Sequence, residues 1–328
     1  MEGNGKLLEV KYLKTWFGSE KEPIKAVDGV SFVVGEGETV ALVGESGCGK
    51  SVTAMSLARL IPQPPGFYAG GEILFQGDDV LKMTNQRLLE LRGRDISYVF
   101  QDPSTSLNPV FRVGDQIMEA LELHRKDVDA KSEAVKLMAM VGLPDPETRI
   151  RAYPHEMSGG MQQRIMIAMA LACRPKLLVA DEPTTALDVT IQAQILELLS
   201  SLQRELKMAV VLITHNLGLV ADTAHSVYVM YSGRVVESGL TEDVLSSPAH
   251  PYTRGLLDAV ARLGAEGKTG EKPDRMKGIP GSVPHPAHLP EGCKFAPRCS
   301  RVQNVCKQKE PKIKSDEKCH SVRCYFPL

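Results

Sequence analysis

The stretch ETVALVGESGCGKS, from Glu38 to Ser51, takes the chain from an apolar run into a glycine-rich loop. Residues 38–43 predict a buried strand, and residues 51–60 predict a helix. A strand, a glycine loop and a helix in this order let backbone N–H groups cradle phosphates, while the lysine reaches the β- and γ-phosphates and the next hydroxyl binds Mg²⁺. A chance glycine turn is the alternative, and both flanks argue against it. The predicted nucleotide-binding residues of this loop are Gly44, Glu45, Ser46, Gly47, Cys48, Gly49, Lys50, Ser51 and Val52.

An acidic pair follows another apolar run much later in the chain. Residues 176–180 predict a strand that leads into Asp181-Glu182-Pro183. Phosphoryl transfer needs a metal ligand and a group that orients the attacking water at the carboxyl end of a parallel sheet. We therefore assign Asp181 to the Mg²⁺ shell and Glu182 to the water. Two carboxylates after a strand are otherwise a solvated turn, and the complete phosphate loop favours the catalytic interpretation.

The segment MSGGMQQR, from Met157 to Arg164, lies between these two motifs and predicts the start of a helix. Adjacent glycines let the backbone approach a ligand, and a helix N-terminus offers free N–H groups and the positive end of the helix dipole. This is a second anion site, which an ATPase with a self-contained active site does not need. It indicates a protein that completes its active site by pairing with another subunit.

Three further polar residues stand at informative places in the order of motifs. Gln101 ends a predicted strand, where its amide can reach Mg²⁺ or the attacking water. Asp188 follows the acidic pair, and His215 ends the apolar run 210–214, where it can bond a γ-phosphate. A single glutamine or histidine after a strand is more often an ordinary surface residue. The functional assignment of these three residues therefore rests on the order of all the motifs.

In this order, residues 1–255 resemble the nucleotide-binding subunit of an ATP-binding-cassette (ABC) transporter. The resemblance rests on six motifs: the Walker A loop, the Q-loop at Gln101, the signature at Ser158-Gly159-Gly160, Walker B at Asp181, the D-loop at Asp188 and the switch histidine His215. It implies an α/β fold, that of a P-loop NTPase cassette. The expected parts are a parallel-sheet core, an antiparallel β subdomain and an α-helical subdomain that ends in the signature.

The resemblance also implies roles for single residues. The implied catalytic residues are Glu182, His215 and Gln101, and the implied Mg²⁺ ligands are Ser51, Gln101 and Asp181. Ser158 and Gly160 would face the ATP held by the opposite subunit, so that two cassettes close head to tail. An aromatic side chain would stack on adenine, with Phe17 as the first choice and Trp16 as the alternative.

The signature departs from the usual Leu-Ser-Gly-Gly-Gln at Met157 and Met161, but it keeps the serine and both glycines. Together with the segments 101–109, 153–156 and 250–257, it is similar to importers of oligopeptides and dipeptides. The resemblance implies an ATPase at the cytoplasmic face of the cell membrane. Its implied partners are a second ABC ATPase (a related chain or a second copy), two transmembrane permease subunits and an extracytoplasmic peptide-binding protein.

Other functions stay open at this point. One is an importer of the same architecture for nickel or another small solute, and another is a soluble ABC ATPase that acts on ribosomes or DNA. The latter usually has two cassettes or a long coiled-coil insert, and the sequence has neither. Glu182 and His215 argue against a regulatory module that does not hydrolyse ATP. Selection of the peptide belongs to other subunits in such systems.

Composition bounds the partners. The chain has 328 residues and a formal net charge of −1, which gives no general electrostatic case for binding nucleic acid or an anionic bilayer. No apolar run approaches the ~18–20 residues that span a membrane. The first residues lack the pattern of a secretory signal. We expect the chain to reach the membrane only through its partners.

We expect one ABC cassette over residues 1–255 and an extension typical of oligopeptide transporters over residues 256–328. A helical subdomain is expected at about residues 103–172, and residues 174–240 are expected to complete the parallel sheet. The extension begins with a polar linker at residues 264–273. Phe111, after the Q-loop, is a candidate for docking on a permease, with ordinary packing as the alternative. The helical spacing that supports the subdomain covers residues 114–124, 130–141 and 158–173.

Five of the seven cysteines crowd into the last 36 positions, 293 to 328: Cys293, Cys299, Cys306, Cys319 and Cys324. Clustered thiols in a cytosolic protein more often bind metal than form disulfides. Four thiolates suit zinc, but the spacing matches no common zinc module. Peptide-importer ATPases have a similar tail, and the resemblance implies a [4Fe–4S] cluster on Cys293, Cys299, Cys306 and Cys324. Zinc and free thiols stay as alternatives, and Cys319 competes with Cys324 as the fourth ligand.

Overall fold

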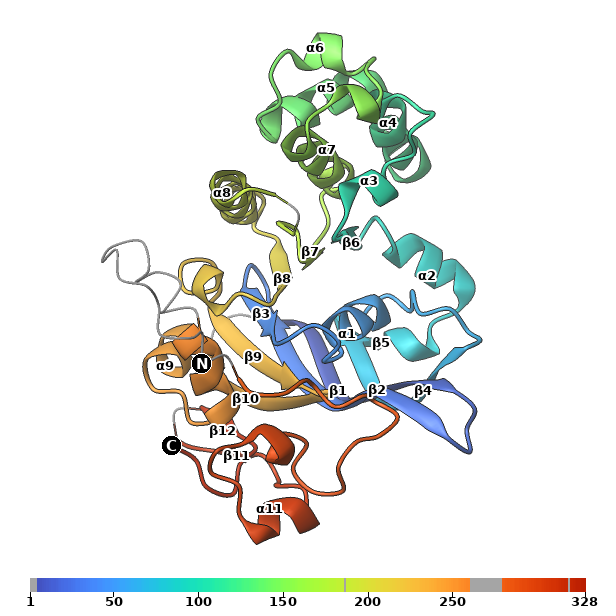
Figure 1. The fold of residues 1–328 in the computed structure, drawn as a ribbon. Coiled ribbons are helices and arrows are strands. Elements are labelled where there is room, and N and C mark those ends of the chain that lie inside the picture. The colour runs from blue at the N-terminus through green and yellow to red at the C-terminus, as the bar shows by residue number, and fades with distance from the viewer. Residues whose placement is uncertain (1–4, 186, 260–278, 318) are drawn as a thin grey trace, which may run out of the picture. The chain divides into compact units, whose positions relative to one another are not determined.

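The computed structural model describes residues 5–185, 187–259, 279–317 and 319–328, which form two compact units (Figure 1). The first unit contains the described residues within 1–7, 34–38 and 82–213. The second contains those within 8–33, 39–81 and 214–328. The expected linker at 264–273 lies outside the described residues.

Three parallel strands form the sheet of the first unit. Strand β7 (Leu177–Asp181) lies between β6 (Ile96–Val99) and β8 (Ala209–Thr214). Every residue of β7 and β8 is buried, because a parallel strand with both faces covered needs a nearly continuous apolar run. The strands expected over 176–180 and 210–214 are therefore confirmed to within one residue at each end.

The helices of the first unit include the three that were expected from their spacing, each within two residues of its predicted ends. Helices α4, α5 and α7 pack against one another (Figure 1). Aspartate and serine caps define several starts, as where the Asp129 carboxylate accepts from the Ser132 N–H at 2.9 Å. The helices are α2 (Asn85–Leu91), α3 (Pro103–Ser106), α4 (Val113–His124), α5 (Ala130–Met140), α6 (Pro146–Arg149), the 3₁₀ turn η2 (Pro154–Glu156), α7 (Gly159–Leu171) and α8 (Val189–Leu206).

The second unit contains strands of two sheets. One sheet has the order β2-β1-β4-β5, formed by β2 (Pro23–Gly35), β1 (Lys6–Gly18), β4 (Gly66–Phe75) and β5 (Asp78–Asp79). The other has the order β11-β12-β10-β9-β3, formed by β11 (Lys314–Ser315), β12 (Ser321–Val322), β10 (Arg234–Leu240), β9 (Ser226–Tyr231) and β3 (Thr39–Val43). The strand expected at 38–43 is β3, and it is entirely buried.

Two sequence expectations are corrected here. Strand β10 was expected to continue a parallel sheet, but it runs antiparallel to β9. The chain reverses in a tight turn at Ser232 and Gly233, whose φ angles of 44° and 75° suit a two-residue hairpin. The helix expected at 51–60 is α1 (Lys50–Ser56), which ends four residues early.

Short helices connect the strands of the second unit. None of the helices among the described residues has the length and apolar character needed to cross a membrane. Besides α1, the short elements are η1 (Val80–Lys82), η3 (Leu217–Leu219), α9 (Thr241–Ser246), a helix over 251–259, η4 (Ala296–Arg298) and α11 (Asn304–Gln308).

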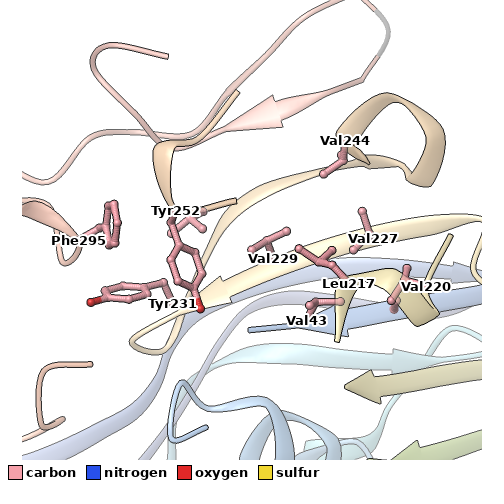
Figure 2. Close-up of a cluster of buried hydrophobic side chains, with 11 residues drawn as sticks. Val43, Leu217, Val220, Val227, Val229, Tyr231, Val244, Tyr252 and Phe295 are labelled. Atoms are coloured by element: carbon pink, nitrogen blue, oxygen red, sulfur yellow. The ribbon is translucent and has the colours of Figure 1, made fainter. Parts of the chain in front are cut away.

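The C-terminal segment contributes to the core of the second unit. The Phe295 ring packs on Tyr231 and Tyr252, with centroid distances of 5.2 Å and 5.4 Å, beside the valines of β3 and β9 (Figure 2). Strand β12 pairs with β10. Burial of these aromatic side chains anchors the tail to the sheet.

Candidate functional site

The phosphate loop of the second unit joins β3 to α1, and close packing requires two of its glycines. A Cβ at Gly44 would lie 2.3 Å from the Met230 carbonyl oxygen, and one at Gly49 would lie 2.4 Å from the Ala26 carbonyl oxygen. Gly49 also has φ 102°, where other residues are strained. A Cβ at Gly47 would meet nothing within 4 Å. The loop is therefore backed by β9 and β2 and open at Gly47.

Lys50 begins α1 with its ammonium folded onto the loop. Its Nζ donates to the carbonyl oxygens of Gly44 at 2.9 Å and Glu45 at 3.1 Å, and the residue is 4% exposed. Ser51, one position later, is exposed. Phosphate oxygens are stronger acceptors for an ammonium than neutral carbonyls. A phosphate bound over this loop can therefore replace the two carbonyls as the acceptor of the lysine ammonium.

Residues that the sequence did not single out hold Glu45. The Arg298 guanidinium donates from Nη1 to Glu45 Oε2 at 2.6 Å and from Nη2 to Oε1 at 2.9 Å. The Glu45 backbone N–H donates to Tyr252 Oη at 2.9 Å. The only sequence signal for Arg298 is its place beside Cys299 in the tail motif. Its partner in the loop could not be found from spacing.

The acidic pair lies at the end of β7 in the first unit. Asp181 is buried, and Glu182 follows it with φ 47°, in the left-handed region. Gln101 Nε2 lies 3.1 Å from Glu182 Oε2, and the Thr185 hydroxyl donates to the same oxygen at 3.0 Å. The Glu182 N–H donates to the Ile213 carbonyl oxygen at 3.0 Å. The structure thus brings together two residues, Gln101 and Glu182, that sequence order alone had connected.

The signature opens α7, as expected. Ser158 is its N-cap and is exposed, and the Ser158 Oγ accepts from the Met161 N–H at 3.4 Å. The preceding turn is held by Gln162, whose amide donates to the Pro154 carbonyl oxygen at 2.7 Å. A Cβ at Gly160 would lie 3.1 Å from the Ile191 Cγ2 atom of α8. Ser158 and Gly159 are exposed, so the N-terminus of α7 is accessible to a ligand from outside the unit.

The adenine and γ-phosphate candidates lie in the second unit. Phe17, near the end of β1, is half-buried and is paired with Gly66 of β4. Trp16 is also half-buried, and the Lys25 Nζ lies 5.0 Å from the centroid of its ring. His215 is exposed after β8. The remaining ATP-site candidates of the second unit are in the phosphate loop, while Gln101, Ser158, Gly160, Asp181 and Glu182 belong to the first unit.

Four cysteines of the tail line one cavity: Cys293, Cys299, Cys306 and Cys324. Burial, together with the three neighbouring thiols, raises the pKa of Cys293 to about 11. Cys319 is exposed and does not line this cavity. Within the described parts of the chain, no three His, Cys, Asp or Glu side chains already stand in the arrangement of a metal site.

The two remaining cysteines, Cys48 and Cys173, lie outside the tail. Burial raises the pKa of Cys48 to about 11, so its thiol is protonated inside the phosphate loop. Burial also raises the pKa of Cys173, whose Sγ lies 3.6 Å from the Ala120 carbonyl oxygen. Both thiols are packing groups, and Cys48 stays a candidate for phosphate binding through its backbone.

Two family models match the chain. The model described as "ABC transporter" matches residues 27–185. The model described as "Oligopeptide/dipeptide transporter, C-terminal region" matches residues 236–306. The first match includes the phosphate loop, the signature and the acidic pair, and the second includes three of the four cavity cysteines.

Known proteins are similar along almost the whole chain. The oligopeptide transport ATP-binding protein AppD of Bacillus subtilis is 47% identical over 322 residues, which cover 98% of this chain and 96% of that protein. The dipeptide transport ATP-binding protein DppD of Haemophilus influenzae is 47% identical over 324 residues, with the same coverage of 98% and 96%.

A solved structure agrees with the fold. The ATP-binding cassette MJ0796, in a dimeric post-hydrolysis state bound to ADP and Pi, superposes with a TM-score of 0.63 at 26% sequence identity. The match covers 71% of this chain and 98% of that one. These relatives, the order of the motifs and the fold together show that the chain belongs to the ATP-binding subunits of ABC transporters, in the oligopeptide and dipeptide branch.

Proposed function

We propose that this chain hydrolyses ATP to drive the import of dipeptides or oligopeptides. The observation that carries the proposal is its near-full-length similarity to AppD and DppD, whose names state oligopeptide and dipeptide transport. The match of residues 236–306 to the C-terminal region of such transporters supports the same class of cargo. The proposed division is a cassette at 1–255, with its helical subdomain at about 103–172, and the extension at 256–328.

The proposed ATP site uses the phosphate loop for the phosphates and Phe17 for adenine. Lys50 would exchange the carbonyls of Gly44 and Glu45 for β- and γ-phosphate oxygens. Ser51, Gln101 and Asp181 would hold Mg²⁺, since their oxygen atoms are the ligands that this ion prefers. When bound, Mg²⁺ neutralises charge on the phosphates.

Glu182 is the proposed group that orients and polarises the attacking water. Its Oε2 atom is held by the Gln101 amide and the Thr185 hydroxyl, so the carboxylate has a defined direction. Its left-handed backbone supports the assignment, because strained residues of this kind concentrate at functional sites. His215 would then bond the γ-phosphate.

The signature is proposed to act on the ATP of another subunit. Ser158 and Gly160 lie at the accessible N-terminus of α7, where N–H groups and the helix dipole attract phosphate. The likeness to a dimeric cassette supports pairing of two cassettes, and we propose that they pair head to tail. ATP would close such a pair, and hydrolysis would release it. The second cassette is a related ATPase or a second copy.

Docking on the membrane partners is proposed for the surface after the Q-loop. Val110 and Phe111 are 73% and 55% exposed, which is unusual for two adjacent large apolar residues. We assign this surface to two transmembrane permease subunits at the cytoplasmic face. An extracytoplasmic peptide-binding protein would deliver the cargo, and the chain would meet the membrane only through these partners.

Uptake by the complex of this chain with its permease partners tests the function. We expect ATP-dependent uptake of a labelled peptide into vesicles, and uptake of labelled nickel without peptide uptake would contradict the proposed cargo.

Glu182→Gln should bind ATP, trap the closed pair and lower turnover by ~10²-fold or more. The control is Glu205→Gln on the exposed face of α8, which should keep normal turnover. Normal turnover in Glu182→Gln would remove that residue from catalysis.

We also propose that Cys293, Cys299, Cys306 and Cys324 hold a [4Fe–4S] cluster. The four thiols line one cavity, and four thiolates are the usual ligands of such a cluster. Cluster binding would release protons, because burial and the neighbouring thiols raise the pKa of Cys293 to about 11. Iron content and visible absorbance after anaerobic purification test the assignment. A colourless chain with stoichiometric zinc would show the alternative metal instead.

A further inference from the structure

The phosphate loop contains a carboxylate at an unfavourable place. Glu45 directly follows Gly44, and its side chain keeps 31% of its surface exposed. A negative charge beside a triphosphate repels it, and this repulsion grows where protein replaces water. A phosphate-binding loop that contains Glu45 therefore needs a way to neutralise the carboxylate charge and to direct it away from the ligand.

Arg298 does both from the tail. Its guanidinium meets both carboxylate oxygens of Glu45, at 2.6 Å and 2.9 Å, and the Arg298 side chain is 4% exposed. A paired fork of this kind is strong and directional. Further N–H groups of Arg298 donate to the carbonyl oxygens of Pro280 at 2.9 Å and Ile279 at 3.2 Å. These contacts hold the fork in one orientation.

A second contact fixes the backbone at the same position. The Glu45 N–H donates to Tyr252 Oη at 2.9 Å, and Tyr252 is fully buried. Its ring packs edge-on against Tyr231 with a centroid distance of 4.7 Å (Figure 2). Burial raises the pKa of Tyr252, so its hydroxyl stays neutral and keeps accepting this hydrogen bond.

We propose that Arg298 is a positioning residue for ATP binding. It acts through Glu45, by neutralising the carboxylate and turning it away from the phosphates. The affinity of the phosphate loop for ATP then depends on the fold of the cysteine-containing tail. This inference rests on the proposed role of the loop in ATP binding.

The test measures KM and kcat for ATP on the full chain in its transporter complex. Arg298→Met should raise KM by about tenfold and leave kcat within about twofold, because the unpaired carboxylate opposes binding. Adding Glu45→Gln should restore KM to within about threefold of the wild type, because no charge is left to neutralise. Arg254→Met, which removes an exposed arginine of the same unit, should leave both constants unchanged.

An unchanged KM in Arg298→Met would overturn the proposal, and so would a raised KM that Glu45→Gln does not restore. The second result would mean that Arg298 only supports the tail. If Arg298→Met does not fold, Arg298→Gln serves for the same comparison, since it removes the positive charge but keeps a side-chain N–H donor. Failure of the proposed function is distinguishable, because the wild type itself would then show no ATP hydrolysis.

Discussion

At the scale of the residue, Glu182 illustrates how a site depends on backbone geometry. Its φ of 47° is rare for a residue with a side chain and costs on the order of 1–3 kcal/mol. The Glu182 N–H donates to the Ile213 carbonyl oxygen and its own carbonyl oxygen accepts from the Thr185 N–H at 3.1 Å, and these two bonds hold the backbone in this conformation. The order of motifs predicted a role for Glu182, but a single φ angle is decided by neighbouring contacts, which spacing does not contain.

The choice between Cys319 and Cys324 is also made at the residue scale. Cys324 lines the cavity with three other cysteines, whereas Cys319 is exposed. We expect Cys324→Ser to lose most of the bound metal and Cys319→Ser to keep it, at about four iron atoms per chain if the cluster is [4Fe–4S]. Metal analysis of the anaerobically purified variants makes the comparison. Equal metal loss in both variants would contradict this ligand set.

At the scale of the element, the helix over 251–259 begins at a buried histidine. The His250 Nδ1 accepts from the Tyr252 N–H at 3.0 Å, and the His250 N–H donates to the buried Glu237 carboxylate at 2.9 Å. Burial lowers the pKa of His250 from 6.5 to about 3. The neutral imidazole therefore caps this helix and stays neutral at physiological pH.

This pKa makes stability depend on pH. The unfolded chain takes up a proton at His250 below pH 6.5, while the folded chain does so only near pH 3. Each unit by which the pH falls within this window therefore lowers the free energy of unfolding by up to about 1.4 kcal/mol. His250→Asn, which can still accept from the N–H two residues on, should remove this contribution. Denaturant unfolding from pH 7 to 5 tests it, and equal slopes in wild type and variant would contradict it.

Individual elements were predictable where the pattern is local. The runs that form β3, β7 and β8 are apolar along their whole length, and α4, α5 and α7 repeat apolar residues at helical spacing. The predicted direction of β10 was wrong, because the direction depends on the positive φ angles at Ser232 and Gly233. The early end of α1 escaped the pattern for a similar reason, since Arg59 has a φ of 51° while the apolar residues continue to Leu60.

At the scale of the whole molecule, the tail is part of the second unit's core. The fully buried Glu237 of β10 lies 2.7 Å from His320 Nε2 and also accepts from the N–H groups of Ala249 and His250. Phe295 adds its ring to the cluster around Tyr231. A buried carboxylate needs all these donors, so the tail and β10 stabilise each other.

The sequence alone determined the fold class and the chemistry, because each motif is a short run whose backbone geometry and residue types act locally. It identified the phosphate loop, the acidic pair and the signature, and it left Cys319 and Cys324 as competing candidates for the fourth ligand in the tail. Only the tertiary structure decided that Cys324 shares the cavity and that Arg298 holds Glu45. Arg298 and Glu45 are 253 positions apart in the sequence, and contacts over such a separation are set by the packing of the strands between them.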